Sequence, residues 1–416
     1  MYLPEYYEFL SPVQIASGHD VLEKIPEYLN TLNAKRPLIL ADKGVTAAGL
    51  ITIVEDAIKD KVAIGAIDDD IPPDSDLKVV SRLATVYRKN NCDAIIAVGG
   101  GSVLDTAKGL NILVSENSDN LMEFAGANKL TRPLKPFLAI PTTAGTGSEL
   151  TMAAVIADHD RFVKILFASR FLLPDIAIID SRMTLTLPAF FTAATAMDAL
   201  THAVESYFCL QKNPLSDVHA LSAISLISRN LLKVIKKPDD QEGRLALAKA
   251  ATLAGMAFSN STVGLVHTLG HSVGGVCGVP HGTCMSIFLP YGLEYNYHLV
   301  SDTIAELLLP LAGPEVYADT PDKMRAEKTI ECIRQLNQDL HNATEGRHAR
   351  FLKEIMDRDG NPMVRKSHFD AIAKTAIGDG TKFYNPEEID YDDSRLVLNA
   401  AWDGRPLNRD LVKKRI

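Results

Sequence analysis

The chain has 416 residues, of which 46% are hydrophobic and 23% charged, as is typical of a globular protein with roughly two domains. Its net charge of −9 argues against nucleic acid or an anionic membrane surface as its main partner, so we expect neither. The five scattered cysteines form no CxxC pair, and we see no signal peptide or uninterrupted apolar run of membrane-spanning length, which predicts a cytoplasmic protein without a disulfide framework.

The first half of the chain alternates strand-like and helix-like segments. Helices are expected at 21–33, about 45–60 and about 76–90, judged by their apolar spacing. Short buried strands are expected at 37–42, 61–67, 92–98, 137–140 and 176–180. This alternation is typical of a parallel sheet covered by helices, so residues 1–185 are predicted to form an α/β, Rossmann-like domain.

The second half of the chain has a different texture. From Leu187 onward it is rich in alanine and leucine at helical spacing, and Pro188 suits the first turn of a helix. We find no clear strand there, so residues 186–416 are predicted to form an all-helical domain. The polar region 338–367 is expected to be surface helix and loop.

A glycine-rich turn follows the strand expected at 92–98. Gly99, Gly100, Gly101 and Ser102 lead into a helix that carries Asp105. Backbone N–H groups exposed at such a helix start suit an anion, for example a pyrophosphate. The turn is not a GxGxxG fingerprint, and a plain turn remains an alternative interpretation.

Two other strand ends support a ligand site at the same edge of the sheet. The loop after 137–140 carries the hydroxyls of Thr142, Thr143 and Thr146. The carboxyl ends of strands line the ligand crevice of an open parallel sheet. Asp42 ends an earlier strand, where a carboxylate can bond ribose hydroxyls and repel a 2′-phosphate, although a simple helix cap explains it equally well.

Three histidines occur in the apolar, glycine-rich stretch 264–284. His267 and His271 are four residues apart and share a helix face, while His281 follows a Val-Pro break. Asp198 and His202 form a second i,i+4 pair in the first long helix of the second half. These donors suit Fe²⁺, Zn²⁺ or Mn²⁺ better than Ca²⁺ or Cu(I). Spacing alone leaves open which histidines bind directly, and hydrogen-bonded core histidines are the alternative.

These motifs resemble those of the iron-containing (group III) alcohol dehydrogenases over nearly the full chain. The matching stretches are 37–44, 99–108, 141–149, 197–205 and 264–282. The resemblance implies an N-terminal dinucleotide-binding domain and a helical metal-binding domain. It further implies that Asp198, His202, His267 and His281 are the metal ligands, and that His271 is a non-ligand used in proton relay.

The resemblance also implies a cofactor site and a substrate pocket. The glycine turn would cradle pyrophosphate, the three threonines would line the cofactor, and Lys164 would lie close to it. Asp42 matches the position that favours NAD(H) over NADP(H). Small side chains at 152–154 indicate a roomy apolar pocket, with Ala153 and Phe258 as walls.

The implied activity is hydride transfer between a primary alcohol or aldehyde and a nicotinamide cofactor, with Fe²⁺ favoured and Zn²⁺ as the alternative ion. The expected assembly is a homodimer or larger homo-oligomer. Alternatives on the same scaffold are a zinc-type polyol dehydrogenase, a dehydroquinate-synthase-type lyase and a hydroxyacid–oxoacid transhydrogenase. A non-enzymatic filament-forming protein is the remote alternative. The segment 338–367 is longer than we expect for the family, and we assign it no role.

Overall fold

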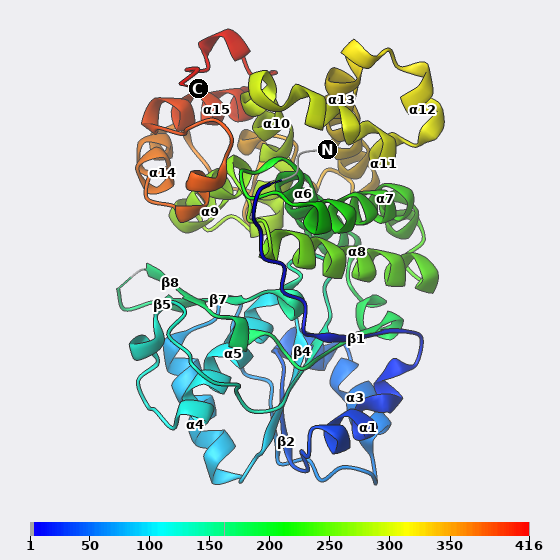
Figure 1. Ribbon diagram of the computed structural model, residues 1–416, viewed down its shortest axis with the longest axis vertical. Coiled ribbons are helices and arrows are strands. Elements are labelled where there is room, and N and C mark those ends of the chain that lie inside the picture. Colours follow the sequence, from blue (N-terminus) through cyan, green and yellow to red (C-terminus); the bar gives the residue numbers. More distant parts are fainter. Residues whose placement is uncertain (1–3, 162, 416) are drawn as a thin grey trace. The chain divides into compact units, whose positions relative to one another are not determined.

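The computed structural model describes residues 4–161 and 163–415, which form two compact units (Figure 1). One unit comprises residues 10–187 and 239–255 and contains every strand of the described chain. The other comprises residues 4–9, 188–238 and 256–415 and is helical. The predicted fold class is therefore confirmed, although the units are not two contiguous halves divided at residue 185.

A six-stranded parallel sheet forms the centre of the α/β unit. Its strand order is β1-β9-β6-β4-β2-β3. The strands are β1 (Gln14–Gly18), β2 (Pro37–Leu40), β3 (Ala66–Asp68), β4 (Ala94–Gly99), β6 (Phe137–Pro141) and β9 (Ile176–Asp180). β2, β4, β6 and β9 are buried along their whole length and are apolar except for Asp180 at the end of β9, as expected of strands covered on both faces.

Successive residues of the central strands contribute to two different cores. Ile95 and Ala97 of β4 pack with residues of α4 (Leu77–Lys89) and α5 (Gly101–Glu116). Ile96 and Val98 of the same strand pack with residues of α1 (Ile25–Thr31) and α3 (Leu50–Ile58). This alternation follows from the two-residue period of a strand, and it holds the carboxyl ends of the strands in a rigid frame.

Several local predictions for this unit were wrong. The strand expected at 61–67 begins only at Ala66. The helix expected at 45–60 is two helices, α2 (Lys43–Ala47) and α3, because Gly49 has a φ of 76° between them. The first helix begins as a 3₁₀ turn, Val21–Lys24. β1 and a second sheet of β5 (Gly126–Ala127), β7 (Ala153–Asp158) and β8 (Val163–Ala168) were not predicted.

The helical unit is built around the long helices α6 (Ala189–Phe208) and α10 (His281–Glu306). The other helices of the second half are α7 (Pro214–Lys236), α8 (Gln241–Ser259), α9 (Leu265–Cys277), α11 (Leu308–Ala312), α12 (Pro314–Asp319), α13 (Arg325–Ala343), α14 (Phe369–Ala376) and α15 (Tyr391–Asp403). α8 contains the unit border at Gly255. Region 338–367 comprises the end of α13, the 3₁₀ turn Leu352–Glu354, a loop with a β-bridge between Met356 and Pro362, and the start of the 3₁₀ turn Lys366–His368.

One helix, α7, is long and apolar enough to span a membrane when only length and composition are considered. It packs against α6 and carries Asp217, which is paired with Lys212 at 2.7 Å. Core helices of globular proteins pass the same composition test, so α7 gives only weak support for a membrane span.

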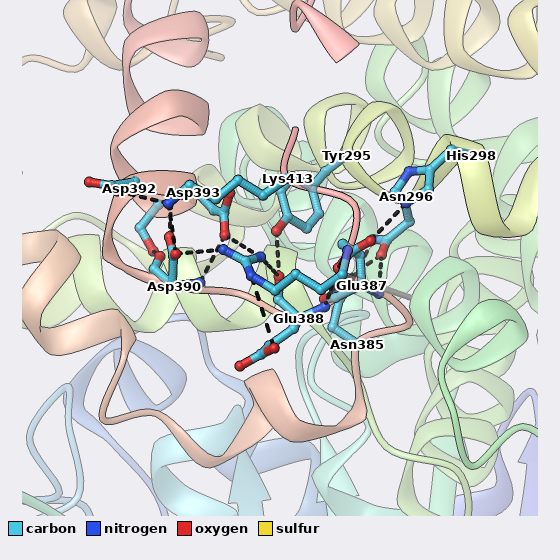
Figure 2. Close-up of polar contacts among 12 residues, drawn as sticks. Tyr295, Asn296, His298, Asn385, Glu387, Glu388, Asp390, Asp392, Asp393 and Lys413 are labelled. Atoms are coloured by element: carbon cyan, nitrogen blue, oxygen red, sulfur yellow. Dashed lines mark hydrogen bonds and ion pairs between the residues drawn. The ribbon is translucent and has the colours of Figure 1, made fainter. Parts of the chain in front are cut away.

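A polar network fastens the segment between α14 and α15 to the helical unit (Figure 2). Asn385 Oδ1 accepts hydrogen bonds from the Leu265 N–H at the start of α9 and from the Asn296 amide of α10. Glu387 is fully buried and accepts a hydrogen bond from His298 at 2.7 Å. These bonds place the loop before α15 directly against α9, which carries two of the candidate histidines.

The chain end continues this network. Lys413 donates to Asp390 at 2.9 Å, and Arg415 forms ion pairs with Asp390 and Asp393. Asp390 and Asp393 also cap the start of α15 reciprocally. The C-terminal residues therefore hold the start of α15, and with it the preceding loop, in one position (Figure 2).

Candidate metal centre

Four predicted ligands come together in the helical unit. Asp198 and His202 lie one turn apart on α6, His267 lies on α9 and His281 is the first residue of α10. One ligand atom from each lies within 4.8 Å of the other three. Such a group of one carboxylate and three imidazoles matches the donor set of a four-coordinate divalent metal site.

Local backbone geometry explains how residues far apart in sequence meet here. Gly278 caps the end of α9 with a φ of 69°, which suits glycine, and Pro280 precedes α10 as its N-cap residue. A Cβ on Gly282 would collide with the backbone of Ala194 on α6. The glycine therefore lets the first turn of α10 approach α6 closely, which brings His281 to Asp198 at 3.2 Å.

The hydrogen bonding of these side chains tests whether they fit a metal. Asp198 Oδ1, His202 Nδ1 and His267 Nε2 are buried and have no hydrogen-bond partner among the described residues. A buried polar atom without a partner costs about 1–3 kcal/mol. Three such atoms facing a common point would be satisfied together by one cation, so the residues fit a bound divalent ion.

Burial also sets protonation states that suit metal binding. It lowers the pKa of His202 to about 3 and holds the pKa of His267 well below its ordinary value. Burial alone would raise the pKa of Asp198, but His202 and His281 hold it below its usual range. At neutral pH the buried centre thus presents neutral imidazoles and an ionised carboxylate, the forms that bind metal.

Glu205 supports the centre from behind and was not assigned a role from the sequence. Its carboxylate is fully buried, and it accepts hydrogen bonds from His267 Nδ1 at 2.5 Å and from the Val266 N–H at 2.7 Å. This contact leaves His267 Nε2 free to point into the cluster. A signal was present in the sequence, because positions 198, 202 and 205 share one helix face.

His271 lies beside the four-residue group but has a different environment. Its ring centre is 5.6 Å from that of His267 and 5.3 Å from that of His281. Its side chain is 43% exposed, and Nδ1 is 2.9 Å from Asp379 Oδ2. It is outside the group of atoms that could share one ion.

The two predicted pocket residues fall in different units. The ring of Phe258 stacks on His202 with centres 4.1 Å apart and nearly parallel planes, so it forms an apolar wall beside the centre. Ala153 opens β7 of the α/β unit, where its carbonyl accepts a hydrogen bond from Lys108.

The predicted cofactor residues gather at one edge of the parallel sheet. β2, β4 and β6 are neighbours, so their carboxyl ends present Asp42, the glycine turn and the threonine loop at that edge. A Cβ at Gly100 would come within 3.2 Å of Thr143, and one at Gly101 within 2.9 Å of Thr146. The glycines are therefore what allows the two loops to pack together. Among the described residues, no side chain caps α5 at Gly100. The N–H groups of Val103 and Leu104 donate to the Gly100 carbonyl, so those of Gly101 and Ser102, at the very start of the helix, are the ones that suit a ligand.

Three other predicted cofactor residues already have protein partners. Asp42 Oδ1 caps α2 by accepting from the Val45 N–H at 2.9 Å, as the simpler interpretation had it. The carboxylate oxygens of Asp105 accept from the Ser148 hydroxyl and the Val155 N–H. Lys164 lies on β8, where it pairs with Asp74 at 3.0 Å and has no hydrogen bond to the glycine turn.

Lys108 holds the threonine loop from inside the unit. Its ammonium group is buried and donates to the Ser148 hydroxyl, to the hydroxyl and carbonyl of Thr151, and to the Ala153 carbonyl. Burial lowers the pKa of Lys108 to about 8. This internal lysine fixes the loop after β6, so the loop does not depend on a ligand for its shape.

Comparison with known proteins gives the same family over both units. The profile described as iron-containing alcohol dehydrogenase matches residues 12–181, and that of the Fe-containing alcohol dehydrogenase family, C-terminal, matches residues 192–402. The 1,3-propanediol dehydrogenase of Klebsiella pneumoniae is 34% identical, over 95% of this chain and 99% of that protein. The NAD-dependent methanol dehydrogenase of Bacillus methanolicus is 37% identical, over 94% and 99%.

Solved structures with the same fold also come from alcohol dehydrogenases. A 1,3-propanediol oxidoreductase superposes with a TM-score of 0.88 at 31% identity, over 96% of this chain and all of that chain. An alcohol dehydrogenase from Oenococcus oeni has a TM-score of 0.88 at 32% identity, over 95% of this chain and all of that chain. The resemblance predicted from the motifs is confirmed: this chain belongs to the iron-containing alcohol dehydrogenase family, whose members are metal-dependent oxidoreductases acting on alcohols and aldehydes.

Proposed function

We propose that this member of the family transfers hydride between a primary alcohol or aldehyde and NAD(H), with Asp198, His202, His267 and His281 holding a divalent ion. One observation carries the proposal. Ligand atoms of the four residues lie within 4.8 Å of one another, and three of the residues have a buried polar atom without a hydrogen-bond partner in the described part of the chain. Such an arrangement is costly unless a cation occupies it.

The bound ion would supply Lewis acidity to the substrate oxygen. His271 would exchange the hydroxyl proton with solvent, which its half-exposed side chain permits. Phe258 would pack against the carbon chain of the substrate and keep water from the face of His202. Ala153 is proposed as a second small wall of the pocket.

The nicotinamide cofactor is proposed to bind at the strand edge of the α/β unit. Gly99, Gly100, Gly101 and Ser102 would hold the pyrophosphate through backbone N–H groups, since no side chain caps α5. Thr142, Thr143 and Thr146 would add hydroxyls. Asp105 and Lys164 would lie near the cofactor without being its main contacts, because both already have protein partners.

We further propose that NAD(H) is preferred over NADP(H). Asp42 follows β2 at the ligand edge of the sheet. Within the described part of the chain, its Oδ1 caps α2, and no contact of its Oδ2 with the cap is seen. A second carboxylate oxygen could accept from a ribose hydroxyl, and the negative charge would repel a 2′-phosphate. The relative from Bacillus methanolicus is named as NAD-dependent, in agreement with this preference.

Fe²⁺ is proposed as the ion over Zn²⁺, and short primary alcohols or their aldehydes as substrates. The relatives named for 1,3-propanediol and methanol support short alcohols. A cytoplasmic homodimer or larger homo-oligomer is proposed as the working form.

The test is NADH and NADPH oxidation by metal-free protein reloaded anaerobically with Fe²⁺ or Zn²⁺, against aldehydes of increasing chain length. We expect metal-dependent turnover, a preference for NADH and an optimum at short chains; Asp42→Ala should narrow the preference between cofactors. Activity on polyols alone, or NAD that stays bound during gel filtration and passes hydride between hydroxy and oxo acids, would replace this proposal. No turnover with either ion despite NADH binding would contradict it.

A further inference from the structure

The carboxylate of Asp379 contacts Nδ1 of His271, just as the carboxylate of Glu205 contacts Nδ1 of His267. We propose that Asp379 is a positioning residue, which holds the His271 ring with Nδ1 protonated and so leaves Nε2 as the nitrogen that exchanges the substrate proton. The inference rests on the proposed function of His271. The contact that carries it is the 2.9 Å distance between His271 Nδ1 and Asp379 Oδ2.

The carboxylate of Asp379 is oriented by its own backbone. Asp379 caps the 3₁₀ turn Gly380–Tyr384, and its Oδ1 accepts from both the N–H and the hydroxyl of Thr381. The side chain is 18% exposed. Because Oδ1 is committed to the cap, Oδ2 is the oxygen presented to the imidazole, and the pair has one defined geometry.

The turn that carries Asp379 is held on α9 at two points. The hydroxyl of Thr381 is 2.8 Å from that of Thr268, which lies one residue after the candidate ligand His267. Further along, Asn385 Oδ1 accepts a hydrogen bond from the N–H of Leu265, the first residue of α9. The carboxylate and the imidazole are therefore positioned by the same helix, so their distance does not depend on a mobile loop.

The two carboxylate–histidine pairs serve different ends because their histidines differ in exposure. The Glu205–His267 pair is buried, and His267 Nε2 belongs to the four atoms that could share an ion. The Asp379–His271 pair holds the same ring nitrogen, but the His271 side chain is 43% exposed and outside that group. An oriented imidazole that reaches water suits proton transfer, whereas an oriented, buried one suits metal ligation.

Asp379→Asn is the decisive variant. The amide oxygen would still accept from Thr381, but an NH₂ group would face His271 Nδ1 and favour the opposite tautomer. We expect kcat for alcohol oxidation to fall roughly 10- to 100-fold, with metal stoichiometry and NADH affinity unchanged. Asp379→Glu should recover part of the loss. The matched control is Asp370→Asn on α14, whose carboxylate bonds Lys374 and Tyr391, and it should keep wild-type kcat.

A second variant separates positioning from general structure. In a His271→Ala background, Asp379→Asn should cause no further loss of kcat; an equal loss in both backgrounds would overturn the proposal. The tautomer gives a readout without turnover. In ¹⁵N-histidine-labelled, Zn²⁺-loaded protein, with His271→Ala used for assignment, we expect Nδ1–H in the wild type and Nε2–H in Asp379→Asn.

The possible outcomes are distinguishable. A wild-type enzyme without alcohol turnover overturns the proposed function, and the relay with it. An active wild type whose Asp379→Asn variant keeps full kcat, or keeps the Nδ1–H tautomer, overturns the role of Asp379 alone.

Discussion

The candidate metal centre of the helical unit and the candidate cofactor edge of the α/β unit are formed by different kinds of chemical group. The centre uses charged or titratable side chains that are buried and in part unpartnered, namely Asp198, His202 and His267. The edge uses backbone N–H groups, hydroxyls and glycines whose missing side chains make room for neighbours. Removing a side chain should therefore damage the first site, whereas adding one should damage the second.

The largest effect is expected from His202→Ala. The change removes a proposed ligand whose Nδ1 has no hydrogen-bond partner in the described part of the chain, so the ion would lose a donor and the substrate oxygen its Lewis acid. Turnover should fall at least about a thousandfold. Metal analysis of the purified protein should show an emptied site. His219→Ala, which alters a partly buried histidine on α7 outside the four-residue group, is the control. A His202→Ala protein with full metal and activity would refute the ligand assignment.

Glu205→Gln tests the support behind the ligands. The neutral amide would weaken the polarisation of His267, and metal affinity should fall roughly 10- to 100-fold. Competition with a chromophoric chelator measures this change. Glu242→Gln is a matched control, because Glu242 also bonds a histidine, His19, but is 83% exposed. Unchanged metal affinity in Glu205→Gln would show that the buried contact only packs the helix.

Gly101→Ala tests the candidate cofactor edge by adding a methyl group there. The new Cβ would lie 2.9 Å from the Thr146 methyl group, so the threonine loop would have to shift. Such overpacking costs about 1–3 kcal/mol, and we expect the Kd for NADH to rise about tenfold while the metal stays bound. NADH fluorescence titration measures it. Gly275→Ala, where a Cβ meets open space, should leave binding unaltered; weakened binding in both variants would contradict the steric argument.

The last two predictions concern the pH dependence of stability rather than activity, and here the two units again differ. In the helical unit, burial lowers the pKa of His348 to about 4 from its ordinary 6.5. The unfolded chain then binds this proton before the folded one, so stability falls as pH drops from 6.5 to 4, by up to about 3 kcal/mol. Urea unfolding at several pH values should show that the free energy of unfolding falls less steeply with decreasing pH in His348→Gln than in the wild type. An identical limb in both proteins would exclude His348 as the cause.

In the α/β unit, the buried Lys108 predicts that folding stability depends on pH in the alkaline range. Its pKa is lowered from 10.5 to about 8, so between these values the unfolded chain holds a proton that the folded chain has lost. Stability should therefore rise with pH across that range, by up to about 3 kcal/mol from this group. The same urea series, extended to pH 10 and compared with Lys108→Met, measures the contribution. If the free energy of unfolding changed with pH in the same way in the wild type and in Lys108→Met, the predicted contribution of Lys108 would be contradicted.

Much of the fold was readable from the sequence because its signals are local. Buried apolar runs predicted the central strands, and the glycines after β4 predicted the turn into α5. The misses have physical causes. β1 lacks a continuous apolar run, and β7 and β8 have exposed positions although they contain apolar stretches, so none of the three resembles a fully buried strand. Gly49 divides a helix whose apolar spacing continues across it. Asp379 gave no signal, since it follows His271 by more than a hundred residues.

The sequence by itself determined the class of fold, the family and the candidate ligand types, because residue spacing and short motifs specify helix faces and strand ends. Only the tertiary structure decided which side chains meet. It separated His271 from the four-atom group, placed Glu205 and Asp379 behind two neighbouring histidines, and gave Asp105 and Lys164 protein partners. Contacts between distant segments depend on how helices and strands pack, and local sequence does not encode that packing.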